Sequence, residues 1–157
     1  MLPAGLGSGL MSRVVGTLAR GHRAVDALRS RGHDLAMTVT DAYAFGSDVP
    51  DELVKFVFSL LDGTPFDVVA DFFPAFADLD VWDACPTLAQ VPTSIVCGSH
   101  DKITAIGHSR KLHARIHGSD LLECEGAGHM VIMERHAQVN AELATLITAA
   151  VDRVERR

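Results

Sequence analysis

Two short apolar segments with a helical pattern between them constrain the fold more than any other feature of this sequence. Residues 93–97 run Thr-Ser-Ile-Val-Cys and end at Gly98, and residues 120–124 run Asp-Leu-Leu-Glu-Cys and end at a glycine-rich loop. Between them, apolar residues recur at helical spacing over residues 105–116. A strand, a helix and a second strand in this order form a right-handed crossover that makes the strands parallel. The sequence therefore predicts an α/β fold.

Helices are expected on both sides of this unit. A helical period from Leu10 to Leu28 predicts a helix that stops at Arg31-Gly32. A second helix is expected to be opened by Asp48, Pro50 and Asp51 and to close at Asp62-Gly63. A third is expected to follow Thr64-Pro65, where Thr can cap the free amides and Pro suits the first helical position. A last helix is expected from Val139 to Val154.

The chain has two compositional halves, because every aromatic residue lies between Tyr43 and Trp82. We expect residues 1–82 to form a helical, lid-like region and residues 83–157 to form the α/β part. Two parallel strands alone do not make a stable sheet, since such strands need cover on both faces and partners at their edges. The sheet is therefore expected to be incomplete in this chain, with poor solubility or self-association as a consequence.

Charge and composition narrow the function classes. Fourteen basic residues against 20 acidic ones give a net charge of −6, which argues against nucleic acid or an anionic membrane as the main partner. No apolar run approaches the roughly 18 residues of a membrane span, and no signal peptide is recognised, so a cytoplasmic location is expected. The three cysteines are far apart and are expected to be buried, reduced thiols. No metal or cofactor is expected.

Two loops carry the candidate chemistry, because each leaves the carboxyl end of an expected strand. Asp101 ends the loop Gly-Ser-His-Asp after the first strand, and His129 ends the loop Gly-Ala-Gly-His after the second. Ligands and catalytic groups collect at this edge of open α/β sheets. There a carboxylate could hold an imidazole in one tautomer and stabilise its protonated form. Taken singly, Asp101 could instead cap the following helix, and His129 could be satisfied by backbone.

Taken together, the two loops resemble the C-terminal part of the α/β-hydrolase fold family. Residues 91–104, Val-Pro-Thr-Ser-Ile-Val-Cys-Gly-Ser-His-Asp-Lys-Ile-Thr, look like the late strand of that family ending in G-x-x-D. Residues 126–134 look like its G-x-G-H loop entering the last helix, and the acid precedes the histidine as in that family. The resemblance implies that Asp101 is the acid of a catalytic triad and His129 its general base. Residues 1–82 sit where the family inserts a variable cap. One departure is Ala105, since in the family a proline commonly follows the threonine that corresponds to Thr104.

The nucleophile of the family is missing from this sequence. The family carries it in G-x-S-x-G on a strand-to-helix turn, and no serine here has glycine two residues away on both sides. Ser109 follows Gly107 but precedes Lys111, within the expected helix. The leading hypothesis is therefore that the chain is the cap and C-terminal part of a serine-type hydrolase that cleaves an ester or related acyl substrate, and that alone it is inactive.

Two alternatives stay open. The same loops serve relatives with an aspartate nucleophile, of the epoxide hydrolase or dehalogenase type. Alternatively, the chain is a non-catalytic module that pairs with a partner or with itself through an open sheet edge. A cluster of phenylalanines either lines a pocket for a small apolar ester or packs a helical lid; these are Phe66, Phe72, Phe73 and Phe76.

Overall fold

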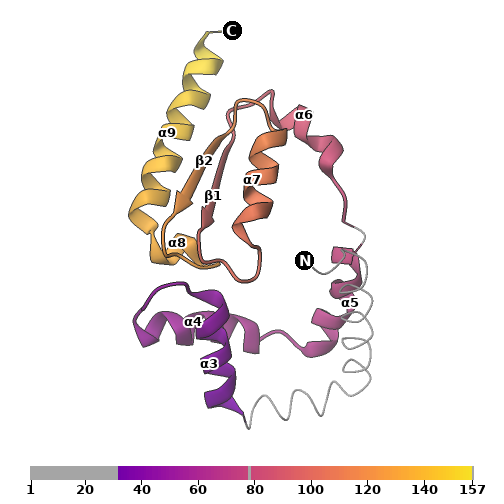
Figure 1. Ribbon diagram of the computed structural model, residues 1–157, viewed down its shortest axis with the longest axis vertical. Helices are drawn as coiled ribbons and strands as arrows, with labels where there is room; N and C mark the ends of the chain where they lie inside the picture. Colours follow the sequence, from indigo (N-terminus) through magenta and orange to yellow (C-terminus); the bar gives the residue numbers. More distant parts are fainter. Residues whose placement is uncertain (1–31, 78, 157) are drawn as a thin grey trace. The chain divides into compact units, whose positions relative to one another are not determined.

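The computed structural model describes residues 32–77 and 79–156, which divide into two compact units (Figure 1). The first unit takes the described residues up to 38 and those between 55 and 80. The second takes residues 39–54 and the chain from 81 onward. The helix expected from Leu10 to Leu28 lies outside the described residues.

The first unit contains most of two helices that the sequence predicts. Helix α4 spans Asp51–Asp62 and α5 spans Phe66–Ala77, which confirms both expected helices near their expected ends. The apolar spacing of α4 buries Val57 and Phe58. Of the four phenylalanines considered for a pocket, Phe72 is the one with a described side chain, and it is 68% exposed.

Helix α3, His33–Ala44, is not predicted by the sequence pattern. Gly32 was expected to end the preceding helix, yet its carbonyl oxygen also accepts the first hydrogen bond of α3, from the Ala36 backbone N–H at 2.9 Å. The run Thr38 to Thr40 is β-branched, which lowers helix propensity and obscures the helical period. Local propensity therefore gave no clear signal for this helix.

The second unit holds the crossover that the sequence predicts. Strand β1 spans Ser94–Gly98 and β2 spans Asp120–Cys124, joined by α7, Ile106–Arg115. The strands are parallel, with a register that pairs Ser94 with Asp120 and Gly98 with Cys124. Among the described residues the sheet has these two strands, so the expected incomplete α/β sheet is confirmed.

Short helices precede and follow this crossover. A 3-10 turn η1 at Trp82–Ala84 and helix α6 at Cys85–Leu88 lead toward β1, and α8 at Val131–Glu134 precedes the long α9, His136–Glu155. Figure 1 shows the two strands running between α7 and α9. No described helix, α9 included, combines the length and the apolar character that crossing a membrane requires.

The core of the second unit is built around Ile116 and Cys124, which are almost fully buried. Cys85 and Cys97 are buried as well, and all three cysteines are free thiols, as expected. Burial, with a smaller contribution from neighbouring Cys97, raises the pKa of the Cys124 thiol. The Cys124 thiol therefore stays protonated and acts as a small apolar side chain.

Candidate active site

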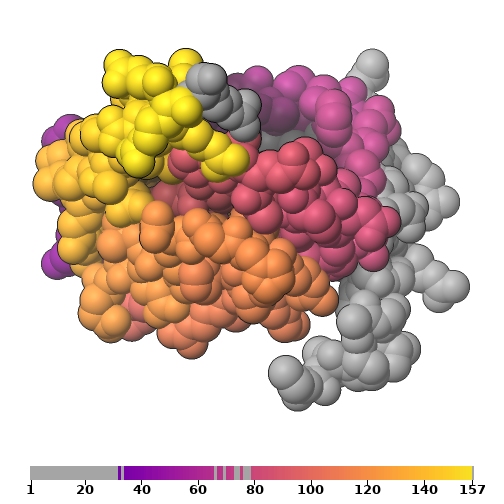
Figure 2. Space-filling view, turned by 90° about the horizontal axis from the view of Figure 1, so that it is seen from above, coloured from indigo at the N-terminus to yellow at the C-terminus, as the bar shows by residue number. Residues whose placement is uncertain are grey.

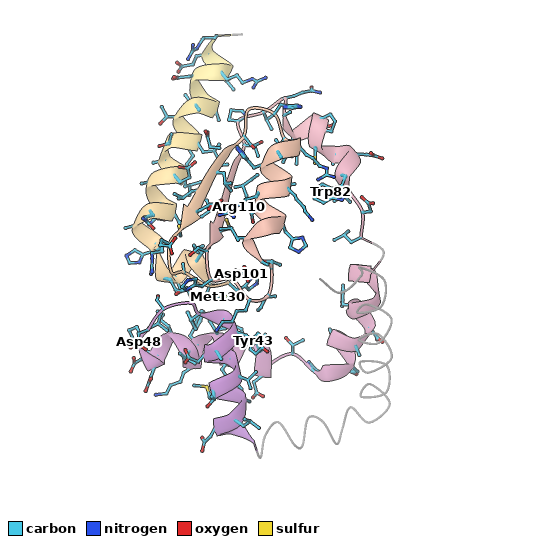
Figure 3. The ribbon with its side chains drawn as sticks, viewed as in Figure 1. Tyr43, Asp48, Trp82, Asp101, Arg110 and Met130 are labelled. Atoms are coloured by element: carbon cyan, nitrogen blue, oxygen red, sulfur yellow. The ribbon has the colours of Figure 1, made fainter. Side chains whose placement is uncertain are left out.

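The loops after β1 and β2 meet at the carboxyl end of the strands, as parallel pairing requires. Backbone N–H groups of Ser99 and His100 donate to the carbonyl oxygens of Cys124 and Ala127, at 3.0 and 2.9 Å. The Ser99 hydroxyl in turn accepts a 2.9 Å hydrogen bond from the Gly126 N–H. Figure 3 shows Asp101 and Met130, one from each loop, at this same end. The two loops therefore form one hydrogen-bonded structure.

Two glycines allow the backbones to approach this closely. A Cβ atom on Gly98 would overlap the carbonyl oxygens of Ala127 and Gly128, and one on Gly128 would overlap the backbone N of Gly46. Three stretches of backbone, from β1, the histidine loop and the segment after α3, thus pack directly on one another. Gly98 and Gly128, one from each motif, serve this close packing, which the sequence alone did not reveal.

Asp101 and His129 are in direct contact. The Nδ1 atom of His129 lies 2.9 Å from Oδ2 of Asp101. The Asp101 side chain is 6% exposed, whereas that of His129 is 33% exposed. The carboxylate is therefore buried, whereas the imidazole is in part accessible to solvent.

Three further hydrogen bonds fix the Asp101 carboxylate. Its Oδ1 accepts from the backbone N–H groups of Ile103 and Thr104, both at 2.8 Å, and its Oδ2 accepts from the Thr104 hydroxyl at 2.7 Å. Burial raises the pKa of Asp101, but the hydrogen bonds from His129 and Thr104, followed by the one from Ile103, together outweigh it, so that pKa lies below its usual value. Asp101 is an anion at neutral pH.

An ionised carboxylate fixes the tautomer of the histidine. Because it can only accept hydrogen bonds, Nδ1 of His129 must carry the proton, which leaves the lone pair on Nε2. Within residues 32–77 and 79–156, no group makes a hydrogen bond to Nε2. An oriented imidazole with a free Nε2 can take a proton from a hydroxyl and later return it.

A segment that the sequence analysis did not single out contacts both loops. The Lys102 Nζ atom donates to the carbonyl oxygen of Ala42 at 2.7 Å, and the Met130 N–H donates to that of Ala44 at 2.8 Å. The Glu134 carboxylate, at the end of the histidine motif, accepts from the backbone of Gly46 and Ser47. Glu134 was part of the quoted motif, but its distance from residues 46 and 47 along the chain hid this role.

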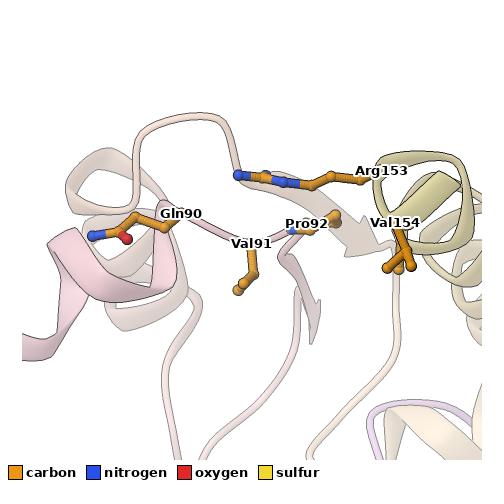
Figure 4. A pocket seen from close by; sticks show the side chains of 6 residues that line it. Gln90, Val91, Pro92, Arg153 and Val154 are labelled. Atoms are coloured by element: carbon orange, nitrogen blue, oxygen red, sulfur yellow. The ribbon is translucent and has the colours of Figure 1, made fainter. Parts of the chain in front are cut away.

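Ser109, the weak nucleophile candidate, lies inside α7 rather than on a turn that leaves a strand. The structure gives it no contact with His129 among the described residues. A pocket of about 270 Å³ lies elsewhere in the unit, lined by residues that precede β1 and by the last turns of α9; these are Gln90, Val91, Pro92, Ala150, Arg153 and Val154 (Figure 4). Figure 2 shows those turns of α9 beside the residues that lead into β1. This is the amino end of the strand, so the pocket is not part of the Asp101–His129 site.

Comparison of the folded chain with solved structures identifies its architecture. An esterase from Exiguobacterium antarcticum matches 87% of the chain with a TM-score of 0.67 and 19% identity, and 48% of that esterase is covered. An enol-lactonase from Burkholderia xenovorans matches 80% of the chain with a TM-score of 0.63 and 21% identity, with 49% of that enzyme covered. This chain has part of an α/β-hydrolase fold.

The match to this fold is partial. A thermophilic esterase from Thermogutta terrifontis is covered over 50% of its length, at a TM-score of 0.59 and 18% identity, so the chain spans about half the length of the solved structures it matches. Neither a protein-family model nor a curated protein matches the sequence. The resemblance in fold that the two loop motifs imply is confirmed.

Proposed function

We propose that this chain supplies the acid and the base of an α/β hydrolase that cleaves an ester or related acyl substrate, with a serine nucleophile that these 157 residues do not contain. Asp101 orients His129 and stabilises the imidazolium that forms when Nε2 of His129 takes the proton of the attacking hydroxyl. The observation that carries the proposal is the 2.9 Å hydrogen bond between Nδ1 of His129 and Oδ2 of Asp101 at the carboxyl end of parallel strands.

The fold and the exposure of the site support this proposal. The matched solved structures include esterases and an enol-lactonase, so the fold suits cleavage of ester-type bonds. His129 is one-third exposed and its free Nε2 is available to a hydroxyl from another segment. An aspartate nucleophile would instead make this site part of an epoxide hydrolase or a dehalogenase.

The purified chain is expected to be inactive. A base cannot cleave an ester when both the nucleophile and the amides that stabilise the oxyanion are missing. We expect no turnover of a chromogenic short-chain ester and no labelling by a serine-directed phosphonate. The DNA upstream of the codon for Met1 is expected to encode a strand followed by G-x-S-x-G. A G-x-D pattern there would assign the aspartate alternative. Turnover that disappears in His129→Ala would contradict the absence of a nucleophile from this chain.

A second candidate function is a non-catalytic module that pairs with another copy through its uncovered surface. One face of α9 supports it, since apolar side chains at successive turns are about half exposed: Leu143, Ile147 and Val151. The two-stranded sheet adds edges that have no partner strand among the described residues. Apolar side chains and strand edges of this kind favour association.

We therefore expect the chain to self-associate, with an apparent mass in size-exclusion chromatography that rises with protein concentration. Ile147→Glu should lower that apparent mass toward the 16.8 kDa of one chain, because a carboxylate on the apolar stripe of α9 is costly to bury. Thr145→Glu is the matched control, at an exposed position of α9 outside the stripe. A sharp monomer at every concentration would rule out this association.

A further inference from the structure

The Glu134 carboxylate collects hydrogen bonds from two distant parts of the chain. Its Oε1 accepts from the Gly128 N–H at 2.6 Å, on the histidine loop. Its Oε2 accepts from the backbone N–H and the hydroxyl of Ser47, at 2.8 and 2.6 Å, and from the Gly46 N–H at 3.1 Å. We infer that Glu134 is a positioning residue, which sets the His129 ring against Asp101 by holding Gly128 onto the segment 46–47.

The chemistry of the donors requires a carboxylate at this position. All four groups that point at Glu134 are donors, three backbone N–H groups and one hydroxyl, and they are divided between its two oxygens. An ionised carboxylate is acceptor-only on both oxygens, whereas an amide would set an NH₂ group against one set of donors. Burial raises the pKa of Glu134, but the hydrogen bonds from Ser47, Gly128 and Gly46 outweigh it, so the pKa is lowered. The anion therefore persists at neutral pH.

Glu134 acts on the His129 ring through the backbone of Gly128 and does not touch the ring itself. Gly128 directly precedes His129, and Met130 on its other side is held by the carbonyl oxygen of Ala44. The Arg135 guanidinium adds hydrogen bonds to the Glu125 carbonyl oxygen and to the Ser47 hydroxyl, at 3.0 and 3.3 Å. The backbone on both sides of His129 is thus fastened to residues 44–47. The inference rests on the proposed function only in naming His129 as the base.

Glu134→Gln tests this role in the full 157-residue chain. In long-range ¹H–¹⁵N spectra of the ¹⁵N-histidine-labelled protein, His129 of the native chain should be the Nδ1–H tautomer, and His129→Ala identifies its signal among the 8 histidines. We expect Glu134→Gln to remove about half or more of the Nδ1–H form, because the loop no longer holds the ring on Asp101. Glu123→Gln is the matched control, since the Glu123 carboxylate on β2 accepts its hydrogen bonds from Arg110 of α7 and not from the histidine loop. The spectrum of this variant should keep the native His129 signal.

A milder variant covers the case in which Glu134→Gln does not fold. Ser47→Ala removes the hydroxyl and with it one hydrogen bond to Glu134 and one from Arg135, while the backbone N–H groups still donate to Glu134. A smaller shift of the His129 signal in the same direction is therefore expected. The inference would be overturned if Glu134→Gln folds and keeps the native His129 signals. If Glu134→Gln does not fold, native signals in Ser47→Ala would overturn it. The readout is the ring itself, so a failure to find ester cleavage in a longer chain would overturn the proposed function and leave this result unaffected.

Discussion

Gly98→Ala is expected to destabilise the second unit by about 3 kcal/mol or more. Gly98 is buried at the end of β1, and a Cβ there would overlap the carbonyl oxygens of Ala127 and Gly128. These atoms are backbone, so no side chain can rotate away, and the histidine loop itself must shift. The change should be measured by urea unfolding followed through the fluorescence of Trp82, the single tryptophan of the chain, which lies in this unit.

The matched control for this variant is Gly107→Ala. Gly107 lies in α7, and a Cβ there meets nothing within 4 Å. Alanine restricts the unfolded chain more than glycine and suits a helix better, so a gain of about 0.5 kcal/mol is expected. The two variants make the same chemical change with opposite expected signs. Equal stabilities would show that the histidine loop does not pack on the end of β1 as closely as the structure has it.

Local patterns were sufficient to predict the parts of the fold that depend on local signals. The apolar runs that became β1 and β2, the helix between them and the end of α4 follow from periodicity and from glycine and proline stops. Parallel pairing followed from the crossover rule. Helix α3 was not predicted, because its β-branched stretch has weak local propensity and its stability depends on surroundings that a period does not encode.

The site, like the fold, was predictable where local signals determine it and not where tertiary packing does. Asp101 and His129 each follow a strand, so strand direction alone brings them to one edge, where the structure places them 2.9 Å apart. Their catalytic roles stay a prediction. The groups that hold them were not found, because Glu134 and Ser47 are 87 residues apart and meet only through tertiary packing. A glutamate five residues after the histidine was visible, but no sequence rule named its donors.

Asp101→Asn is expected to produce the largest functional effect, through the tautomer of His129. The backbone N–H groups of Ile103 and Thr104 both point at the Oδ1 position, so they hold the amide oxygen of asparagine there. The amide NH₂ then occupies the Oδ2 position and faces Nδ1 of His129. A donor at that place forces Nδ1 to accept, which moves the ring proton to Nε2 and blocks the nitrogen needed as base. The hydrogen-bonding pattern of this loop thus leaves the amide one favourable orientation.

In a polypeptide extended upstream to include the nucleophile that we propose, Asp101→Asn should lower kcat for a short-chain ester by about 10⁴-fold, the cost of a wrong histidine tautomer in a triad. Asp120→Asn, the same change at the exposed amino end of β2, should leave kcat within about twofold, because surface substitutions away from a site have small effects. The 157-residue chain provides a second readout, since ¹⁵N-histidine spectra of Asp101→Asn should show His129 as the Nε2–H tautomer. Two results would contradict the assignment of Asp101 as the acid of the triad: retention of more than about a tenth of native kcat, or an unchanged Nδ1–H signal. Either result would mean that the Asp101 carboxylate does not determine which ring nitrogen of His129 carries the proton.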